Sequence, residues 1–254
     1  MSEGQPIGLI CAIPQELSHL REVLAHDRAE DIAGFRFDHG ALDGHDVVVA
    51  EAGIGKVNTA TVATLLAMRF AARTIVFTGV AGGLDPALAI GDVVVGKRAI
   101  QHDAGVIEDG RLHPYQAGHV PFFNPTDRFG HACKPELLER VAARIGDLAL
   151  PPLSREAGGQ GRPPQLVLGT VLAGDQFINC EATRERLHRD FDAQAVAMEG
   201  GALAQVAERF GLPWLEIRAL SDLAGKESHI DFAAFVDQVA ASSFTVLRRI
   251  LPAL

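Results

Sequence analysis

The chain has 254 residues, of which 48% are hydrophobic and 22% are charged, and its formal net charge is −9. A chain of this length can bury a sizeable core. The acidic balance argues against a nucleic acid or an anionic membrane as partner, because either requires a concentrated basic surface. We therefore expect a small-molecule partner.

The N-terminal residues carry no basic, apolar leader, and no run of about 18 apolar residues occurs anywhere. The three cysteines, Cys11, Cys133 and Cys180, are far apart and outside any CxxC spacing. This pattern indicates neither a disulfide framework nor a zinc site. We expect a soluble cytoplasmic protein in which Cys11 is a small core residue.

Apolar runs of strand length alternate with helical patterns along the chain, which predicts a mostly parallel sheet covered by helices. Strands are expected at 7–12, 46–51, 74–80, 92–96, 166–173, 194–198 and 213–219. Helices are expected at about 14–25, 56–70, 134–146, 181–190, 200–210 and 231–250, the last one with Asp231 as its N-cap. Asp43-Gly44 is typical of a tight turn, so the strand after it should arrive by a hairpin and make the sheet mixed.

Two segments read as long loops. Residues 105–131 combine Gly, Pro, His and aromatic residues, and a loop of this length and composition is a candidate for function. Residues 151–164 are rich in Pro and Gly and are expected to be a surface insertion. The sequence has no repeats, and we expect residues 1–254 to form a single domain.

Three carboxylates follow apolar, strand-like runs: Glu16, Glu199 and Asp222. Ligands of open α/β sheets bind beyond the carboxyl ends of the strands, so these side chains can address one small molecule. Each would be buried at a cost unless it is paired. A structural ion pair with Arg218 is the alternative for Glu199 or Asp222, and Glu16 could simply complement a helix dipole.

Two glycine-containing runs, at 53–56 and 78–83, lack the spacing of a P-loop and of a dinucleotide-binding turn. They are interpreted as tight turns whose glycines let the backbone approach a ligand. Four histidines between 102 and 131 have no metal-ligand spacing, so we expect no metal there and a solvated or pocket-lining role for one or two of them.

Taken in order, several runs resemble the nucleoside phosphorylase/nucleosidase family, and specifically its 5′-methylthioadenosine/S-adenosylhomocysteine nucleosidases. The runs span most of the chain and are IGLICAIPQE (7–16), GIGKV (53–57), TGVAGGL (78–84), GDVVV (91–95), HDA (102–104), GDQFIN (174–179), Met198-Glu199, RALSD (218–222) and Ser228-His229. The resemblance implies a three-layer α/β/α fold with a central twisted mixed sheet. It also implies an N-glycosidase that releases adenine from 5′-thio nucleosides, without a cofactor or a metal.

The catalytic roles that the resemblance implies fall on five residues. Asp222 would protonate or hydrogen-bond N7 of adenine, with Ser221 orienting it, and Glu199 would hold the ribose hydroxyls. Glu16 would activate the attacking water, with Arg218 nearby. These roles agree with the chemistry of N-glycosidic bond hydrolysis. An acid at N7 makes adenine a better leaving group, and a carboxylate stabilises the oxocarbenium-like sugar.

Substrate-binding roles are carried over in the same way. Phe177 would stack on the base, the backbone of Ile178 would read its edge, and Met198 would lie beside the ribose. The walls of the site would be formed by Ile13, Ile54, Val80, Ala81, Gly82, Val106 and Phe232. Val106, Ile13 and Phe232, together with the aromatic segment 113–123, would surround the 5′ substituent.

Four positions depart from the pattern of the nucleosidases. Val80 stands where these enzymes often have Ser, Ile13 where they often have Met, and Gly200-Gly201 follows the ribose-binding Glu in place of bulkier small residues. These departures bear on substrate specificity and leave the reaction class unchanged.

Other functions stay open for this sequence: aminodeoxyfutalosine hydrolysis, purine nucleoside phosphorolysis, or nucleoside binding without turnover. A phosphorylase would require cationic residues for phosphate. Residues 12–16 offer an acid where phosphorylases place a glycine-rich phosphate turn followed by Arg, and TGVAGG lacks the Arg that phosphorylases have nearby. Members of the resembled family form homodimers in which a partner loop closes the 5′ pocket. We therefore expect a homodimer with segment 113–123 at its interface.

Overall fold

The computed structural model describes residues 4–226 and 228–254. Its main sheet has the strand order β11-β10-β6-β12-β5-β1-β4-β3-β2, with β9 paired to β6. The strands are β1 (Ile7–Cys11), β2 (Ala25–Ile32), β3 (Phe35–Leu42), β4 (His45–Glu51), β5 (Thr74–Gly83), β6 (Val93–Gln101), β9 (His131–Ala132), β10 (Leu166–Ala173), β11 (Ala195–Ala197) and β12 (Trp214–Asp222). The sheet contains both parallel and antiparallel pairs, so it is mixed as predicted.

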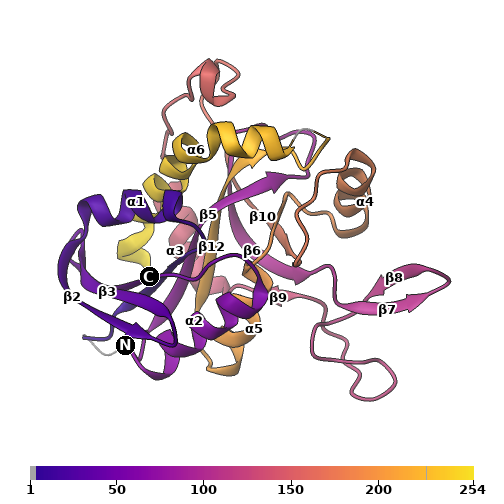
Figure 1. The fold of residues 1–254 in the computed structure, drawn as a ribbon, viewed down its shortest axis with the longest axis horizontal. Coiled ribbons are helices and arrows are strands. Elements are labelled where there is room, and N and C mark those ends of the chain that lie inside the picture. Colours follow the sequence, from indigo (N-terminus) through magenta and orange to yellow (C-terminus); the bar gives the residue numbers. More distant parts are fainter. Residues whose placement is uncertain (1–3, 227) are drawn as a thin grey trace.

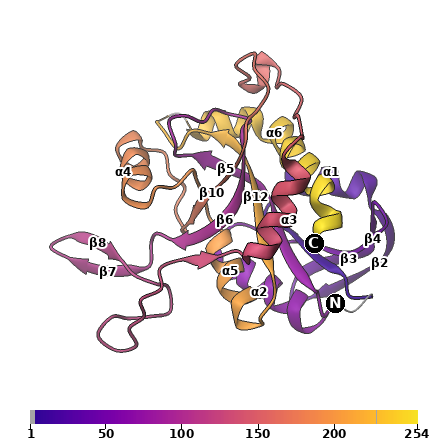
Figure 2. The same cartoon turned by 180° about the vertical axis from the view of Figure 1, so that it is seen from behind.

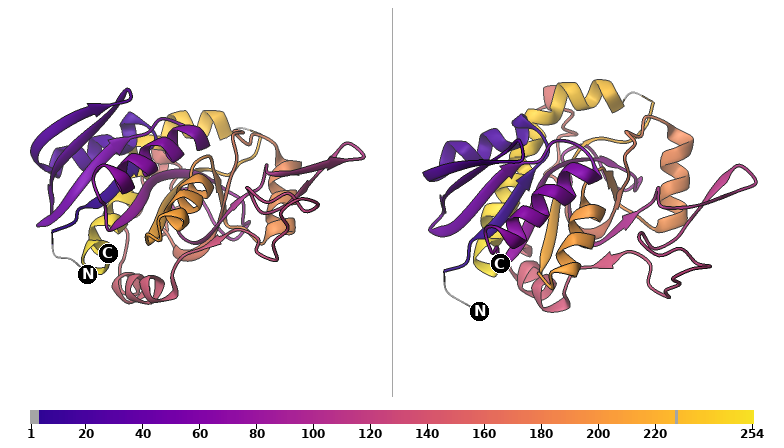
Figure 3. Two further views of the ribbon diagram at one scale, coloured as in Figure 1. Left: turned by 90° about the horizontal axis from the view of Figure 1, so that it is seen from below. Right: turned by 60° about the horizontal axis from the view of Figure 1, so that its bottom comes forward.

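Helices cover both faces of this sheet (Figures 1 and 2). On one side, α1 (Pro14–Val23) and α3 (Pro135–Ile145) pack against α6 (Ser228–Ile250), which lies on β12 and β5. On the other side, α2 (Lys56–Met68) lies beside α5 (Gly200–Arg209), as Figure 3 shows. The three-layer α/β/α arrangement is therefore confirmed. Within residues 4–226 and 228–254, none of the helices has the length and apolar character of a membrane span.

One feature of the sheet goes beyond the predicted architecture. The short strand β11 pairs with β10 in parallel and also with β5 in antiparallel fashion. Strands β5, β12, β6, β10 and β11 therefore close into a ring, which continues through β5 into the rest of the sheet. The main hydrophobic cluster contains residues from Ile7 to Ala253.

The predicted strands and helices are all present, although their ends move by a few residues. Cys11 is fully buried, as expected. The hairpin at Asp43-Gly44 is confirmed, because β3 and β4 pair in antiparallel fashion on either side of it. The N-cap prediction is wrong, since α6 begins at Ser228 and Asp231 lies inside its first turn.

Strand β2 was missed because its residues are mostly polar and exposed and show no alternation of buried side chains. The remaining irregular segments are also more ordered than expected. Part of the loop predicted at 105–131 is a hairpin of β7 (Gly105–Glu108) and β8 (Arg111–Pro114), which projects from the body of the molecule (Figure 1). Residues 151–164 include the 3₁₀ turn η1 (Arg155–Ala157), and Arg162 anchors them through two bonds to the buried Asp92.

The remaining elements are α4 (Glu181–Phe191) and the C-terminal 3₁₀ turn η2 (Leu251–Ala253). Strands β1, β5 and β12 run parallel to one another, so their carboxyl ends meet at the same edge of the sheet. Glu16 follows β1 and Asp222 ends β12. The fold therefore brings Glu16 and Asp222 to one edge of the sheet, as the topology of an α/β sheet predicts. Glu199 follows β11, which runs antiparallel to β5.

Candidate active site

A cavity of about 340 Å³ opens at this edge of the sheet. All of the predicted site residues except Val106 line it: Ile13, Glu16, Ile54, Val80, Ala81, Gly82, Phe177, Ile178, Met198, Glu199, Arg218, Ser221, Asp222 and Phe232. The cavity is also lined by residues to which sequence reasoning gave no role: Ala12, Gln176, Val196, Ala197 and His229. Four of these five lie within two positions of a predicted residue, so extending each motif slightly would have found them.

Glu16 is held by backbone N–H groups of the turn between β1 and α1 and of strand β5. It lies in the first turn of α1, two residues after Pro14, and its Oε2 accepts hydrogen bonds from the backbone N–H of Ala12 at 2.7 Å and of Ile13 at 3.3 Å. Its Oε1 accepts from the N–H of Val80 on β5 at 2.9 Å. Gly79 makes room for it, because a Cβ there would collide with the carboxylate.

Burial dominates the acid–base behaviour of Glu16. It raises the pKa of this carboxyl to about 7, against the opposing effects of Arg218 and the backbone donors. A carboxylate with a pKa near neutrality can accept and release a proton at physiological pH. The side chain of Val80 is apolar, but its backbone makes two polar contacts in the site. Its N–H donates to Glu16, and its carbonyl accepts from Arg218 at 3.3 Å.

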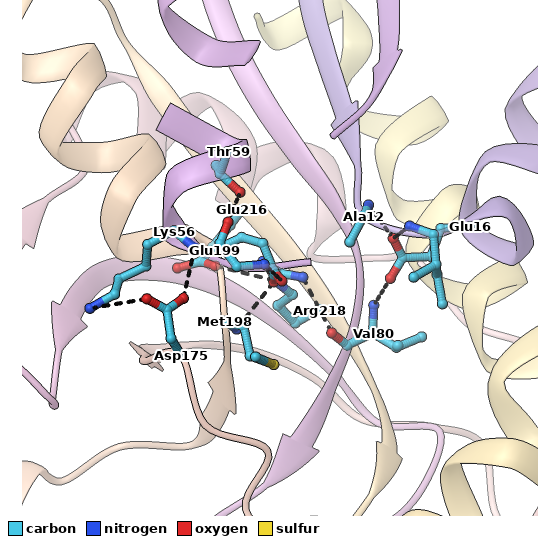
Figure 4. Close-up of polar contacts among 12 residues, drawn as sticks. Ala12, Glu16, Lys56, Thr59, Val80, Asp175, Met198, Glu199, Glu216 and Arg218 are labelled. Carbon is cyan, nitrogen blue, oxygen red and sulfur yellow. Dashed lines mark hydrogen bonds and ion pairs between the residues drawn. The ribbon is translucent and has the colours of Figure 1, made fainter. Parts of the chain in front are cut away.

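Glu199 and Arg218, which both line the cavity, form a buried ion pair (Figure 4). Arg218 Nη2 lies 3.1 Å from Glu199 Oε2, which also accepts from the N–H of Met198, and Glu199 Oε1 accepts from the N–H of Gly55 at 3.1 Å. The Arg218 guanidinium lies over the Phe77 ring at 4.1 Å. The sequence allowed Glu199 to be either a ligand-binding carboxylate or a structural ion-pair partner of Arg218. The two roles are compatible, because the residue is ion-paired and still lines the cavity.

Arg218 has a second acidic partner, Glu216, to which the sequence analysis gave no role. Its Nε donates to Glu216 Oε2 at 3.3 Å, and Glu216 is fully buried. Burial raises the pKa of Glu216 to about 7.

Asp222 has a different environment. It is 2% exposed, and its oxygens accept from Ser221 Oγ at 3.0 Å and from the N–H of Ala224 at 2.8 Å. A β-bulge between Leu220 and Asp222 shifts the register and re-aims the end of β12. Burial raises the pKa of Asp222, and no cation pairs with it in the described part of the chain. Its protonated form is therefore favoured relative to a free aspartate.

Part of the cavity wall is apolar and is formed by Phe177, Ile178 and Phe232. Phe177 is half-exposed and meets the Phe232 ring edge-on, with centroids 6.1 Å apart, while Ile178 is buried. His229, from the first turn of α6, lies within 3.4 Å of Asn179. A planar aromatic base fits this wall, because aromatic side chains stack on flat apolar ligands.

A polar clip ties together the loops that border the cavity. Lys56 Nζ contacts both oxygens of Asp103 at 2.7 and 2.8 Å, and the N–H of Asp175 donates to the same carboxylate at 2.9 Å. Asp175 in turn accepts from the N–H of Lys56 at 2.8 Å, at the start of α2. Sequence reasoning did not identify this clip, because its members come from three separate motifs.

Val106 does not line the cavity of its own chain, contrary to its grouping with the wall residues. It lies on β7 of the projecting hairpin, so it could reach a pocket only across an interface between chains. Of the four histidines between 102 and 131, His102 and His131 are buried away from the cavity and His113 is exposed. None of the four lines the cavity, and the described residues contain no cluster of three potential metal ligands.

Comparisons with known proteins agree with this geometry. The family model described as the phosphorylase superfamily matches residues 6–252. A 5′-methylthioadenosine/S-adenosylhomocysteine nucleosidase of Mycobacterium tuberculosis is 56% identical over 248 residues, which cover 98% of this chain and 97% of the relative. One from Bacillus subtilis is 34% identical over 246 residues, covering 96% and 97% of the two chains.

Solved structures show the same fold over nearly the full length. The nucleosidase of Neisseria meningitidis in complex with methylthio-immucillin-A superposes with a TM-score of 0.83 at 30% identity, covering 98% of this chain and 100% of that one. The futalosine hydrolase of Helicobacter pylori superposes with a TM-score of 0.82 at 27% identity, covering 98% of each chain. With a family match over residues 6–252 and 56% identity to a relative of nearly equal length, the chain belongs to the phosphorylase superfamily and, within it, to the 5′-methylthioadenosine/S-adenosylhomocysteine nucleosidases.

Proposed function

We propose that this chain is an N-glycosidase that hydrolyses 5′-methylthioadenosine and S-adenosylhomocysteine and releases adenine. The observation that carries the proposal is the set of three carboxylates around one cavity, each in its own electrostatic environment. The family relationship supports the same substrate class, as does the methylthio-immucillin-A with which the Neisseria nucleosidase forms its complex.

In the proposed reaction Asp222 donates a proton or a hydrogen bond to N7 of adenine, and the bond between N9 and C1′ breaks with its electrons moving to the base. Ser221 keeps Asp222 oriented through its 3.0 Å hydrogen bond. A carboxyl whose pKa is raised by burial suits this role, because a general acid must hold its proton until the leaving group needs it.

The sugar becomes oxocarbenium-like as the bond breaks. Glu199 would accept hydrogen bonds from the ribose hydroxyls and stabilise the positive charge, with Met198 beside it. Glu16 would take a proton from water, whose oxygen then bonds to C1′ on the face opposite adenine. This is the inverting arrangement of two carboxyl groups that glycosidases use at oxygen glycosides.

Binding of the substrate would use the apolar wall. Phe177 would stack on adenine and the backbone of Ile178 would hydrogen-bond its edge, while Ile13 and Phe232 would pack around the 5′-thio group. The remaining lining residues with proposed contacts are Ile54, Val80, Ala81 and Gly82. The proposed mechanism requires neither a metal nor a cofactor.

Hydrolysis is favoured over phosphorolysis by the charges at the cavity. Among the described residues that line it, Arg218 is the sole lysine or arginine, and it is already engaged by Glu199 and Glu216. A phosphate dianion would lack a free cationic partner there. We also propose that the chain acts in the cytoplasm, which its three free cysteines support.

The chain also resembles futalosine hydrolase in its fold. The second candidate substrate is therefore a nucleoside that has the same adenine and a different 5′ group. The two are distinguished by adenine release from a panel of 5′-substituted adenosines that includes aminodeoxyfutalosine. Faster turnover of aminodeoxyfutalosine than of 5′-methylthioadenosine would favour the second candidate.

The first prediction concerns the nucleophile. Adenine release from 5′-methylthioadenosine is expected to proceed at the same rate with and without inorganic phosphate, because Glu16 can activate water and the cavity offers phosphate no free cation. The measurement is product analysis by chromatography, with the free 5′-methylthioribose expected. A requirement for phosphate, with a ribose 1-phosphate product, would show that the enzyme is a phosphorylase.

Asp222→Asn is expected to fold and to lose roughly 10²-fold or more in kcat, the usual scale of general acid–base catalysis. The matched control is Asp237→Asn, which removes an exposed carboxylate on α6. Steady-state kinetics and a thermal melt of both variants check this. Near-normal kcat in a folded Asp222→Asn variant would remove this residue from the acid role.

The pH profile tests Glu16. Its carboxyl works as a base only when it is ionised, and its pKa is about 7, so kcat/KM of the wild type is expected to fall as pH drops below about 7. Glu16→Gln cannot ionise, and it should lose roughly 10²-fold or more in kcat together with this acid limb. A Glu16→Gln variant that keeps the wild-type limb would assign the titration to another group.

We further propose that the chain forms a homodimer in which the segment 113–123 reaches the 5′ pocket of the partner. Phe122 and Phe123 are 88% and 83% exposed, and exposed aromatic residues of this kind are enriched at interfaces. Val106, on the neighbouring strand of the hairpin, would reach the pocket from the same side. A twofold arrangement would give each site one such segment.

Replacing Tyr115, Phe122 and Phe123 together by Ala is expected to raise KM for 5′-alkylthio substrates, to affect adenosine less, and to weaken the dimer. Kinetics with both substrates and light scattering measure these effects. Phe210→Ala, which truncates an exposed aromatic residue at the end of α5, is the control. A monomeric wild type, or a triple variant with unchanged 5′ preference, would contradict the proposed interface.

A further inference from the structure

Glu216 has no role in the function proposed above, yet it is the most deeply buried acidic residue of the site region. It lies on β12, two positions before Arg218 and on the same face of the strand, and its side chain is 0% exposed. Oε2 accepts from Arg218 Nε at 3.3 Å, while Oε1 has no hydrogen-bond partner among the described residues. Glu216 does not line the cavity, so any effect on substrate passes through Arg218.

Two glycines provide the space that Glu216 occupies. A Cβ at Gly96, on the neighbouring strand β6, would lie 2.5 Å from Glu216 Cγ, and a Cβ at Gly200 would collide with the carboxylate itself. Gly200 is the first residue of α5, directly after Glu199. Its departure from the bulkier small residues typical of the nucleosidases therefore has a physical reason, since the space beside it is filled by the side chain of Glu216.

The charges of this cluster do not balance if every group is ionised. One guanidinium, that of Arg218, acts on the carboxyls of Glu16, Glu199 and Glu216. An additional buried anion without a cation of its own is strongly disfavoured. At least one of these carboxyls is therefore expected to hold a proton at neutral pH.

Glu216 is the carboxyl best suited to hold that proton. Glu16 accepts hydrogen bonds from three backbone N–H groups, and Glu199 accepts from two, in addition to Arg218. Glu216 accepts only from Arg218 Nε within the described structure. Because hydrogen bonds from backbone donors favour the ionised form, Glu216 is the least stabilised of the three as an anion.

We propose that Glu216 is a positioning residue for the hydrolysis. In its neutral form Glu216 accepts a hydrogen bond from Arg218 Nε and keeps the guanidinium in place, so that Glu199 is the ionised partner of Arg218. This role rests on the proposed function, because it concerns how Glu199 is presented to the ribose. Burial raises the pKa of Glu216 to about 7, in agreement with a carboxyl that is protonated below neutrality.

Ionisation of Glu216 would make the activity depend on pH. The charged groups that act on Glu216 are Arg218, on its own strand, and Glu199, at the start of α5. On the neighbouring strand β6, the uncharged Gly96 lies against the Glu216 side chain. When the carboxyl of Glu216, whose pKa is about 7, ionises as pH rises, it competes with Glu199 for Arg218. Gln is a neutral isostere of Glu and cannot ionise, so at this position it does not compete with Glu199 for Arg218 at any pH.

The experiment compares Glu216→Gln and Glu216→Leu with the wild type, using adenine release from 5′-methylthioadenosine at pH values on both sides of 7. Glu216→Gln keeps an oxygen that accepts from Arg218 Nε, and it is expected to stay close to wild type at low pH. Its kcat/KM relative to wild type is expected to increase as pH rises through about 7, the pKa of Glu216. Glu216→Leu removes the acceptor, and it is expected to lose roughly 10²-fold in kcat/KM, the scale of a misplaced catalytic group.

Two further variants distinguish positioning from a general structural role. Asp92→Asn alters another buried carboxylate that pairs with an arginine away from the cavity, and it is expected to lower Tm with kcat unchanged. Gly200→Ala leaves Glu216 in the chain but displaces its carboxylate, and it is expected to reproduce the defect of Glu216→Leu. This variant supplies the test if Glu216→Leu does not fold.

Each outcome bears on a different claim. An active wild type with an unimpaired Glu216→Leu or Gly200→Ala variant would overturn the positioning role and leave the proposed function standing. A Glu216→Gln variant as impaired as Glu216→Leu at every pH would show that the charged form is needed, which also overturns that role. A wild type that releases no adenine would overturn the proposed function and the positioning role with it.

Discussion

The site depends on one buried cation. The guanidinium of Arg218 is 1% exposed, lies over Phe77, and donates to Glu199, Glu216 and the carbonyl of Val80. An ionised carboxylate in an apolar setting needs a cation or hydrogen-bond donors to offset its loss of hydration, and breaking a buried ion pair typically costs about 3–5 kcal/mol. Because the same group touches β5, β12 and the start of α5, it fixes the relative position of three elements that carry the chemistry.

Around this cation the fold creates three carboxyl groups of unlike character from the same functional group. Glu199 has an ionic partner, Glu16 has backbone donors in the turn after β1 and on β5, and Asp222 has two hydrogen bonds and no cation in the described chain. The pKa values of Glu16 and Asp222 are raised by burial. Because the three carboxyl groups have different hydrogen-bond and ionic partners, one site can hold groups suited to the roles of acid, base and charge stabiliser.

Much of this arrangement could be predicted from the sequence, because it is encoded locally. Strand-length apolar runs that end in Glu or Asp locate Glu199 and Asp222, and the ordered family runs locate most of the cavity wall. The pairing of Glu216 with Arg218, the clip at Lys56 and the second partner strand of β11 could not be predicted in this way. The clip and the strand pairing join segments that are distant in the chain, and the Glu216 pair depends on space left by Gly96 and Gly200 on other elements.

Strand β2 illustrates the same limit and has a consequence of its own. It is the outermost strand at one end of the main sheet, and its polar residues include His26, Asp27, Arg28, Glu30 and Asp31. An outer strand exposes unpaired N–H and C=O groups that can recruit a strand from another molecule and start aggregation. A row of charged side chains makes such recruitment unfavourable, since a docking strand would have to bury them. The composition that conceals β2 from a periodicity search is thus what keeps this end of the sheet from adding further strands.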